Sequence, residues 1–351
     1  MSKGASKKSR SVCWAFVALV VLATQGNSRD GLAADYRGTI IDAQGQLRCE
    51  TNEVVIYTAI KKFDVAHTLL SAGGCNEVSK LSGLDLRVLK LVEELKGRAS
   101  FLISPKKKFL KNLFRADQLH FDKAVGFAEI MVQHVPYKHP SVRTKGINRD
   151  LQSGRTKKEI SLVLGRKVPV MLHLELNDFE DQSAKILEQL KDLLKRKPNG
   201  NFILMHMAQA SVSEARDLIG NHENIYFLTS GADALLAASL EYNRRKGYIA
   251  QIGWINLFND PPKGAPYNGW FRDYLPTLKW RAEWKTLIES YPDRFIFAMD
   301  NVLANHWKKR YRFTLALWRK AFSQLSEETA RKVACANANH LWRLNVECKT
   351  R

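Results

Sequence analysis

Short apolar runs alternate with longer amphipathic segments along most of this chain. Short runs rich in branched residues are typical of buried strands, and apolar positions three and four apart are typical of helices. The runs predict eight strands, at residues 39–43, 65–70, 99–103, 125–132, 168–174, 201–207, 225–228 and 294–299. Helical spacing predicts helices at residues 84–95, 181–195, 212–219, 280–290 and 312–322, and a final helix over 326–347.

This alternation of strand and helix indicates parallel βα units. Eight strands separated by helices favour a closed (β/α)8 barrel of the TIM type, in a single domain, over an open sheet. The stretch 247–275 holds Pro261, Pro262 and many aromatic residues, and we predict that it is a loop insertion after the seventh strand. Loops that follow barrel strands line the active-site face, so we expect the insertion to cover the site.

The first 34 residues differ from the rest of the chain. Four cations between Lys3 and Arg10 precede an apolar run over 12–23 and then small and polar residues, which is the layout of a signal peptide. A membrane-spanning helix needs roughly 20 apolar residues, so we predict a cleaved leader without a stable membrane span. An uncleaved N-terminal anchor is the alternative. In both cases residues 35–351 form the barrel domain and are exported, to the periplasm or the exterior.

The cysteines fit an oxidising compartment. Cys13 lies in the predicted leader, which leaves Cys49, Cys75, Cys335 and Cys348. None of them has the close spacing of a zinc knuckle or a redox motif. Four cysteines allow three pairings, so structural disulfides and free buried thiols both remain open.

The chain is strongly basic. Its formal net charge is +20, and loss of the five cations and one anion in residues 1–34 leaves +16. This charge favours anionic partners, such as a carboxylate or phosphate substrate, an acidic envelope surface or nucleic acid. The cations are dispersed apart from short clusters at 106–108 and 308–310, and no nucleic-acid-binding motif accompanies them. We therefore expect a small-molecule substrate and no specific nucleic-acid partner, and no pattern indicates an oligomeric state.

Polar residues stand at the carboxyl ends of the predicted strands, where a barrel gathers side chains into one mouth. Gln44 and Gln46 follow strand one, His173 ends strand five, His206 ends strand six and Asp300 follows strand eight. A carboxyl group after the apolar run 295–299 is costly to bury unless it is paired or binds a ligand.

Two more acidic residues are secondary candidates. Glu129 in strand four and Glu175 after strand five either belong to the site or stabilise the fold by pairing with arginine. Single histidines such as His134 and His306 have no assigned role, nor does Trp307.

The sequence around these positions resembles the amidohydrolase-related family. The resemblance covers most of the chain beyond the leader and rests on the residues TIIDA at 39–43, PVMLH at 169–173, FILMH at 202–206, FIFAMD at 295–300 and NANHLW at 337–342. Members of this family are (β/α)8 barrels that act as metal-dependent hydrolases or nonoxidative decarboxylases. The resemblance therefore implies this fold and a divalent metal ion.

Strand one departs from the family's pattern. Family members end this strand in a His-x-His pair that holds the ion, whereas Gln44 and Gln46 occupy those positions here. An amide oxygen is a weak, neutral ligand that suits hard ions better than zinc. The candidate ligands for zinc or another divalent ion are thus His173, Asp300, Gln44 and Gln46.

The resemblance also implies a chemistry. An ion would polarise a substrate carbonyl, Asp300 would accept the proton of the attacking water, and His206 would stabilise the developing oxyanion. Without an ion, Asp300 and His173 would serve as a base and an acid. We predict an exported hydrolase of an ester, lactone or amide. The alternative, favoured by Gln44 and Gln46, is an inactive barrel that binds a ligand or an envelope partner.

Overall fold

The computed structural model describes residues 35–74, 83–103, 122–139, 142–144, 146–248, 253–261 and 270–350. The chain divides into two units, 1–34 and 35–351, and the described residues all belong to the second. The predicted leader, Cys75 and the cation cluster at 106–108 lie outside these ranges. Among the described residues, no helix has the length and apolarity needed to cross a membrane.

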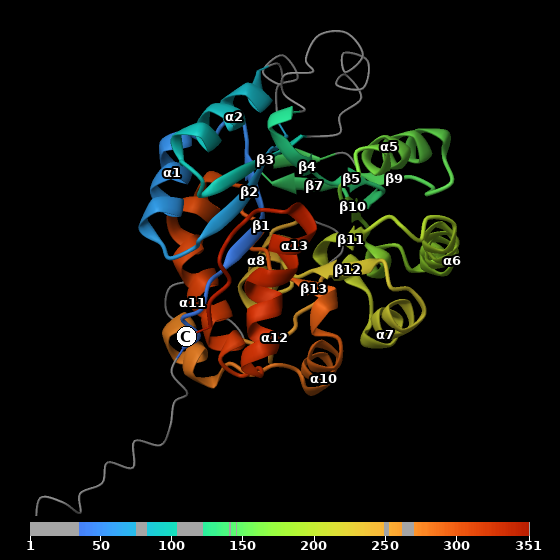
Figure 1. The fold of residues 1–351 in the computed structure, drawn as a ribbon. Coiled ribbons are helices and arrows are strands. Elements are labelled where there is room, and N and C mark those ends of the chain that lie inside the picture. Colours follow the sequence, from blue (N-terminus) through green and yellow to red (C-terminus); the bar gives the residue numbers. More distant parts are fainter. Residues whose placement is uncertain are drawn as a thin grey trace, which may run out of the picture. The chain divides into compact units, whose positions relative to one another are not determined.

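Parallel strands form two sheets (Figure 1). The first sheet has the order β1 (Ile41–Leu47), β2 (His67–Ala72), β3 (Ala99–Ile103) and β4 (Ala124–Phe127). The second has the order β13 (Phe295–Ile296), β12 (Ile225–Leu228), β11 (Phe202–Leu204), β10 (Val170–His173) and β5 (Ile130–Met131). All nine of these strands lie within a predicted strand or overlap it, and β4 and β5 share the predicted strand 125–132.

Backbone hydrogen bonds close the strand order into a ring. The Ala43 N–H donates to the Phe297 carbonyl at 3.1 Å, and the Gln46 N–H donates to the Asn301 carbonyl at 2.9 Å. The segment that follows β13 is thereby paired with β1. Because β4 and β5 are two parts of one strand, the order is that of the predicted (β/α)8 barrel.

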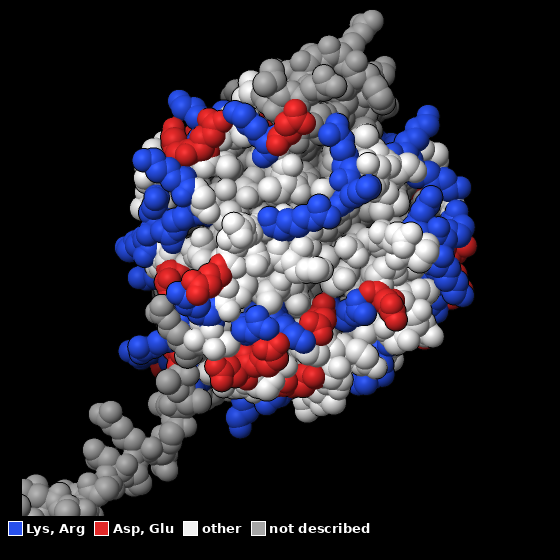
Figure 2. All heavy atoms as spheres, in the orientation of Figure 1, with Lys and Arg blue, Asp and Glu red and all other residues white. Residues whose placement is uncertain are grey.

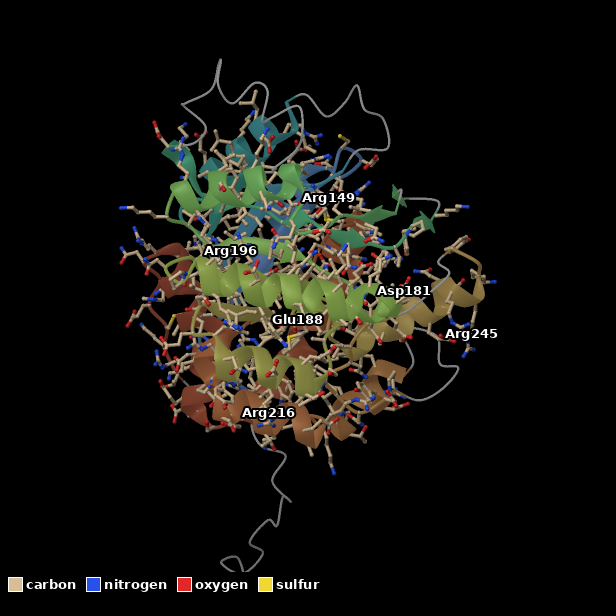
Figure 3. All side chains as sticks on the ribbon, turned by 90° about the vertical axis from the view of Figure 1, so that its right-hand side faces the viewer. Arg149, Asp181, Glu188, Arg196, Arg216 and Arg245 are labelled. Atoms are coloured by element: carbon tan, nitrogen blue, oxygen red, sulfur yellow. A yellow bond between two sulfur atoms is a disulfide. The ribbon has the colours of Figure 1, made fainter. Side chains whose placement is uncertain are left out.

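Helices cover the outside of the strands (Figure 1). They are α1 (Glu53–Lys62), α2 (Leu84–Glu94), α5 (Gly154–Gly165), α6 (Glu180–Arg196), α7 (Val212–Asn221), α8 (Ala234–Arg245), α9 (Trp270–Tyr274), α10 (Ala282–Ser290), α11 (Tyr311–Phe322), α12 (Glu327–Arg331) and α13 (Asn337–Trp342). In α6, Ile186, Leu190 and Leu193 are buried on one stripe, while Asp181 and Glu188 lie on the outer side (Figure 3).

The barrel interior is a packed core. Side chains of Ile41, Leu69, Leu102, Met171, Ile203, Leu228 and Ile296 fill it, and Leu341 and Trp342 of α13 belong to the same cluster. A second cluster fills the space between the strands and the helices. The interior is therefore a filled core and no pore.

Several predicted boundaries are wrong, among them those of strand one and of the final helix. Strand one was expected to end at residue 43, but β1 continues to Leu47 because its pairing with β2 extends to Ala72. The helix expected over 326–347 contains a π-helical turn at Lys332–Ala336 and ends at Trp342, where Arg343 takes a left-handed conformation.

Four of the described helices were not predicted, namely α1, α5, α8 and the short α9. The insertion predicted at 247–275 is described at 253–261 and from Trp270, and it follows α8 rather than β12 directly. A further insertion follows β5, with β6 (Gln133–His134) paired to β9 (Ile147–Asn148) and β7 (Tyr137–His139) paired to β8 (Val142–Thr144).

Candidate active site

A chain of hydrogen bonds joins the carboxyl ends of β1 and β10 through Glu129, which lies between β4 and β5. Gln46 Nε2 donates to Glu129 Oε1 at 3.1 Å, and His173 Nδ1 lies 2.8 Å from Glu129 Oε2. On its other side, His173 Nε2 lies 3.0 Å from Glu175 Oε1. The Val135 backbone N–H anchors the second oxygen of Glu175 at 2.6 Å. His173 is therefore fixed between two carboxylates.

His206 lies against this chain of groups. Its ring centroid is 4.7 Å from that of His173, and its Nδ1 lies 2.8 Å from the Ser230 carbonyl oxygen. Because a carbonyl only accepts, Nδ1 carries the proton in the neutral ring and Nε2 keeps its lone pair. On the far side, the Trp254 ring lies 4.5 Å from the His206 ring.

The backbone at His206 is unusual. His206, Met207, Ala208 and Gln209 have φ angles of 53°, 56°, 54° and 53°, so four consecutive residues other than glycine form a left-handed turn. Each such residue costs roughly 1–2 kcal/mol relative to a right-handed conformation. Strain of this kind persists only where the surrounding structure enforces it, and it is concentrated at functional sites.

Glu129 and His173 titrate as a coupled pair. Burial opposes charge on both groups, but their mutual hydrogen bond and attraction outweigh it. The pKa of Glu129 falls to about 2, and Glu129 and Glu175 together raise the pKa of His173 to about 10. Burial and the neighbouring His173 charge lower the pKa of His206. Without a bound ion, His173 is thus an imidazolium while His206 is neutral.

Two aspartates lie where β1 meets the end of strand eight. Asp42 is fully buried and accepts hydrogen bonds from the backbone N–H groups of Met299 at 2.9 Å and Gln44 at 3.3 Å. Burial raises the pKa of Asp42 to about 7. Burial also raises the pKa of Asp300, and His206 opposes that shift. A carboxyl group whose pKa moves toward neutrality is better suited to accept a proton.

The side chains at the strand ends fit a divalent ion. Glu129, His173 and His206 each offer a ligand atom, and these atoms lie within 4.8 Å of one another. Glu175 holds one nitrogen of His173, and the Ser230 carbonyl holds one nitrogen of His206, which is how ligand imidazoles are normally oriented.

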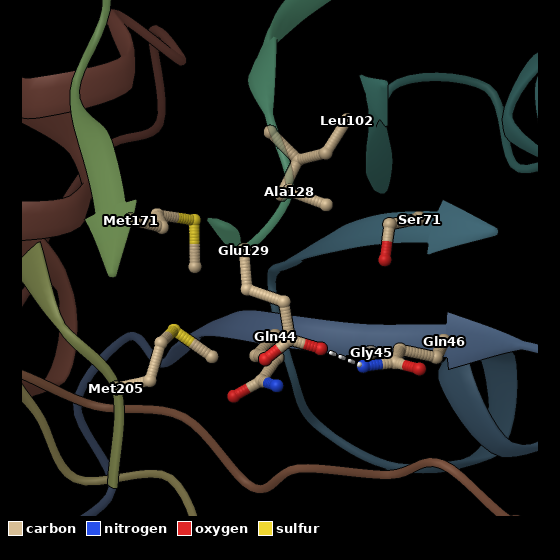
Figure 4. Close-up of a pocket in the computed structure, with 9 residues that line it drawn as sticks. All are labelled: Gln44, Gly45, Gln46, Ser71, Leu102, Ala128, Glu129, Met171 and Met205. Carbon is tan, nitrogen blue, oxygen red and sulfur yellow. Dashed lines mark hydrogen bonds between the residues drawn. The ribbon is translucent and has the colours of Figure 1, made fainter. Parts of the chain in front are cut away.

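Gln44 adds an unsatisfied oxygen to this region. Gln44 Oε1 is buried and has no hydrogen-bond partner in the described part of the chain. Gln44, Gln46 and Glu129 line one small cavity, together with Gly45, Ser71, Leu102, Ala128, Met171 and Met205 (Figure 4). A buried oxygen without a donor is a site where a cation or a substrate donor would be stabilised.

A second group of possible ligands shares His173. His134, His173 and Glu175 also have ligand atoms within 4.8 Å of one another. The His134 ring lies 5.1 Å from that of His173. The first group, Glu129, His173 and His206, includes a residue that lines the cavity, namely Glu129. It is therefore the better candidate for the ion.

The family is shown by the sequence itself. Residues 161–344, more than half of the chain, match the amidohydrolase family. The chain belongs to the amidohydrolase family. No curated protein sequence matches it.

Solved structures share the amidohydrolase barrel. One, from Pseudomonas putida, is described provisionally as a 2-pyrone-4,6-dicarboxylic acid hydrolase; it is 12% identical, with a TM-score of 0.50, over 88% of this chain and 99% of that chain. Another, an amidohydrolase from Burkholderia multivorans with bound HEPES, is 11% identical, with a TM-score of 0.50, over 87% of this chain and 99% of that chain. At these identities the likeness shows the fold.

The predicted site residues are arranged as follows in this amidohydrolase barrel. Gln44, Gln46, His173 and His206 come together at the strand ends. Asp300 follows β13 with a left-handed φ of 53° and is electrostatically coupled to His206 and Glu129.

Several expectations about single residues change. Glu129 and Glu175 pair with His173 rather than with an arginine. His173 also bonds to these two glutamates and not to Asp300. Trp307 is structural, since a side chain on Gly45 would lie 2.8 Å from its ring.

Sequence reasoning missed other residues near the site. His134 was left unassigned because a lone histidine in a short polar segment carries no periodic signal, and its approach to His173 depends on the pairing of β6 with β9. Trp254 was included only in a loop without a motif. Arg48 was also missed, although it continues the alternation of Gln44 and Gln46 along β1.

Proposed function

We propose that this protein is an exported, metal-dependent hydrolase that cleaves an ester, lactone or amide bond in an anionic small molecule. The observation that carries the proposal is the convergence of Glu129, His173 and His206, whose outer ring nitrogens are held by Glu175 and by the Ser230 carbonyl. A carboxylate and two imidazoles are suitable ligands for zinc and for several other divalent ions.

Each residue has a role in this proposal. Glu129, His173 and His206 would hold the ion, with the oxygens of Gln44 and Gln46 beside them in place of the usual imidazoles. The ion supplies Lewis acidity toward a carbonyl and a water of lowered pKa. Asp300 accepts the proton of the attacking water, because burial raises its pKa toward the working range of a general base. Because His206 Nδ1 donates to the Ser230 carbonyl and Nε2 would hold the ion, His206 keeps no N–H for a developing oxyanion, and the oxyanion role expected from the resemblance is not part of this proposal.

Arg48 supports an anionic substrate. Its side chain is 8% exposed, its Nε has no hydrogen-bond partner among the described residues, and its ion pair with the exposed Glu50 is long, at 3.6 Å. A side chain on Gly73 would lie 2.8 Å from Arg48 Cγ and 3.0 Å from Gln46 Oε1, so Arg48 lies beside the cavity residues. A buried guanidinium with an unused donor is a suitable partner for a carboxylate or a phosphate.

Export is supported by the leader-like residues 1–34 and by a disulfide between Cys335 and Cys348. On the face drawn in Figure 2, the cations of the described residues are spread among acidic groups and form no single patch. Arg310, part of the predicted cluster at 308–310, is buried and pairs with Asp233 at 3.4 Å. This distribution favours a small anionic substrate over a polyanion.

The test is elemental analysis of the exported protein and its Asp300→Asn variant. We expect about one divalent ion per chain in the parent and hydrolysis of activated esters by the loaded protein. The variant is expected to lose activity by roughly 100-fold or more, the contribution of a general base. Loss of the ion as well would show that Asp300 is a ligand.

The matched control is Asp293→Asn, which changes the same group at the opposite end of strand eight, where Asp293 pairs with Lys332 at the surface. It should leave both metal and activity unchanged. A parent that retains no ion and gains no activity with any added divalent ion would instead support the inactive, ligand-binding barrel that Gln44 and Gln46 favour.

A further inference from the structure

Hydrogen bonds join three loops next to His206. Gln209, in the left-handed turn, donates from Nε2 to Asp178 Oδ2 at 2.8 Å, and the Asp178 backbone N–H donates back to Gln209 Oε1 at 3.1 Å. Asp178 belongs to the loop after β10 and Gln209 to the loop after β11. Both residues are buried, so this reciprocal pair holds the two loops together without competition from water.

The third loop is the insertion that follows α8. The Gly253 backbone N–H stabilises the Asp178 carboxylate, and the Gly253 carbonyl accepts from Asn177 Nδ2 at 3.0 Å. A side chain on Gly253 would lie 2.5 Å from Gln209 Oε1 and 2.8 Å from the Asp178 nitrogen. Only glycine allows this close approach of the insertion to the pair.

The next residue, Trp254, covers His206. Its ring lies 4.5 Å from the His206 ring, and it packs on Gly231, where a side chain would clash with it. Gly231 has a φ of 70°, which glycine adopts without strain. Trp254 is thus placed by contacts at Gly253, Gly231 and His206 rather than by a regular element.

We propose that Asp178 and Gln209 are positioning residues, which hold His206 in its left-handed turn and Trp254 over the His206 ring. Neither residue belongs to a candidate ligand group, and neither lines the cavity of Figure 4. It stabilises a turn whose four residues would otherwise relax toward right-handed geometry and move His206 away from Glu129 and His173. The inference deepens the proposed metal site and rests on it only for the ion-binding part of the test.

Two variants test the proposal. Gln209→Ala removes the pair, and Gly253→Ala keeps its atoms but forces the insertion away from it. Their controls are Asn224→Ala, which removes a buried amide bonded to the Leu194 and Lys197 carbonyls before β12, and Gly220→Ala, which adds a methyl group in open space on α7.

The first measurement is amide hydrogen exchange in the metal-free proteins. Both test variants should increase exchange in two separate segments, 203–211 and 253–259, whereas the controls should not. Exchange that rises in only one of these segments, or equally in the Asn224→Ala variant, would overturn the proposal whether or not the protein binds an ion.

The second measurement is the dissociation constant for Zn²⁺ by equilibrium dialysis. We expect it to rise by about 10-fold or more in both test variants, the usual effect of removing groups that orient metal ligands, and to stay unchanged in the controls. An unchanged affinity in the test variants would contradict the positioning of His206. Absence of Zn²⁺ binding in the parent would contradict the proposed function, and the exchange result would then decide the positioning proposal alone.

Discussion

Single residues at the barrel mouth combine charge with burial in different ways. Arg48 is buried, and its Nε has no hydrogen-bond partner in the described part of the chain. Asp42 is buried as well, but its Oδ1 accepts from two backbone N–H groups and its Oδ2 from the Asn301 side chain. For Arg48 the long ion pair with Glu50, at 3.6 Å, leaves donor capacity for a ligand, and for Asp42 the existing partners indicate a role in the fold. The two residues therefore give different kinds of prediction.

Arg48→Gln should reduce recognition of negatively charged substrates. A hydrogen bond to a charged group contributes about 1.5–3 kcal/mol, so KM for an ester bearing a carboxylate should rise by roughly 10-fold or more. A neutral ester of the same alcohol is the control, and its KM should change little. Equal increases for both esters would show that Arg48 maintains the shape of the mouth and does not bind the substrate's charge.

The raised pKa of Asp42 predicts that the free energy of unfolding depends on pH. Its pKa in the folded protein, about 7, lies above the ordinary value of 3.8 because burial penalises the carboxylate. The folded state thus binds more protons than the unfolded state between these pH values, so the free energy of unfolding falls as the pH rises. The full effect of this shift is about 4 kcal/mol, at about 1.4 kcal/mol per pKa unit.

Asp42→Asn removes this dependence because an amide does not ionise, while its oxygen still accepts from the Met299 N–H. Urea unfolding of both proteins with a chelator present, from pH 5 to pH 8, measures the difference. We expect the variant to gain stability relative to the parent as the pH rises. A difference that stays constant over this range would mean that Asp42 ionises normally in the folded protein.

At the scale of elements, the C-terminal segment departs from regular helical geometry. A π-helical turn at Lys332–Ala336 separates α12 from α13, and the chain beyond Trp342 returns to the start of the barrel, where the Thr39 N–H donates to the Lys349 carbonyl at 3.0 Å. The disulfide between Cys335 and Cys348 fastens this segment to the π-helical turn. The C-terminal segment covers one end of the barrel, and the candidate site lies at the other end.

Removal of this disulfide should therefore affect stability and not the site. Closing a loop of this length contributes about 3 kcal/mol by restricting the unfolded chain. The Cys335→Ala, Cys348→Ala double variant should unfold at lower urea concentration by that amount and bind metal as the parent does. Ser183→Ala, which removes an exposed hydroxyl on α6, is the control. Loss of metal affinity in the double variant would show that the two barrel ends are coupled.

At the scale of the whole molecule, the sequence by itself determined the barrel. Buried parallel strands must be almost wholly apolar, and the helices between them must be amphipathic, so both leave a periodic signal. The strand ends were also readable, because His173, His206 and Asp300 each follow an apolar run directly. Helices α1, α5 and α8 and the extension of β1 were missed, since their polar residues interrupt the period that identifies an element.

Only the tertiary structure decided how the site is arranged. The partners of His173 are Glu129 and Glu175, and those of Gln209 and His206 come from other loops, so none of these contacts is encoded in local spacing. Trp254 contacts His206 from an insertion that has no recognisable motif. The left-handed turn at His206–Gln209 contains no glycine, so the sequence does not indicate it. The physical reason is that periodicity records which face of an element is buried, whereas a site depends on side chains brought together from distant parts of the chain.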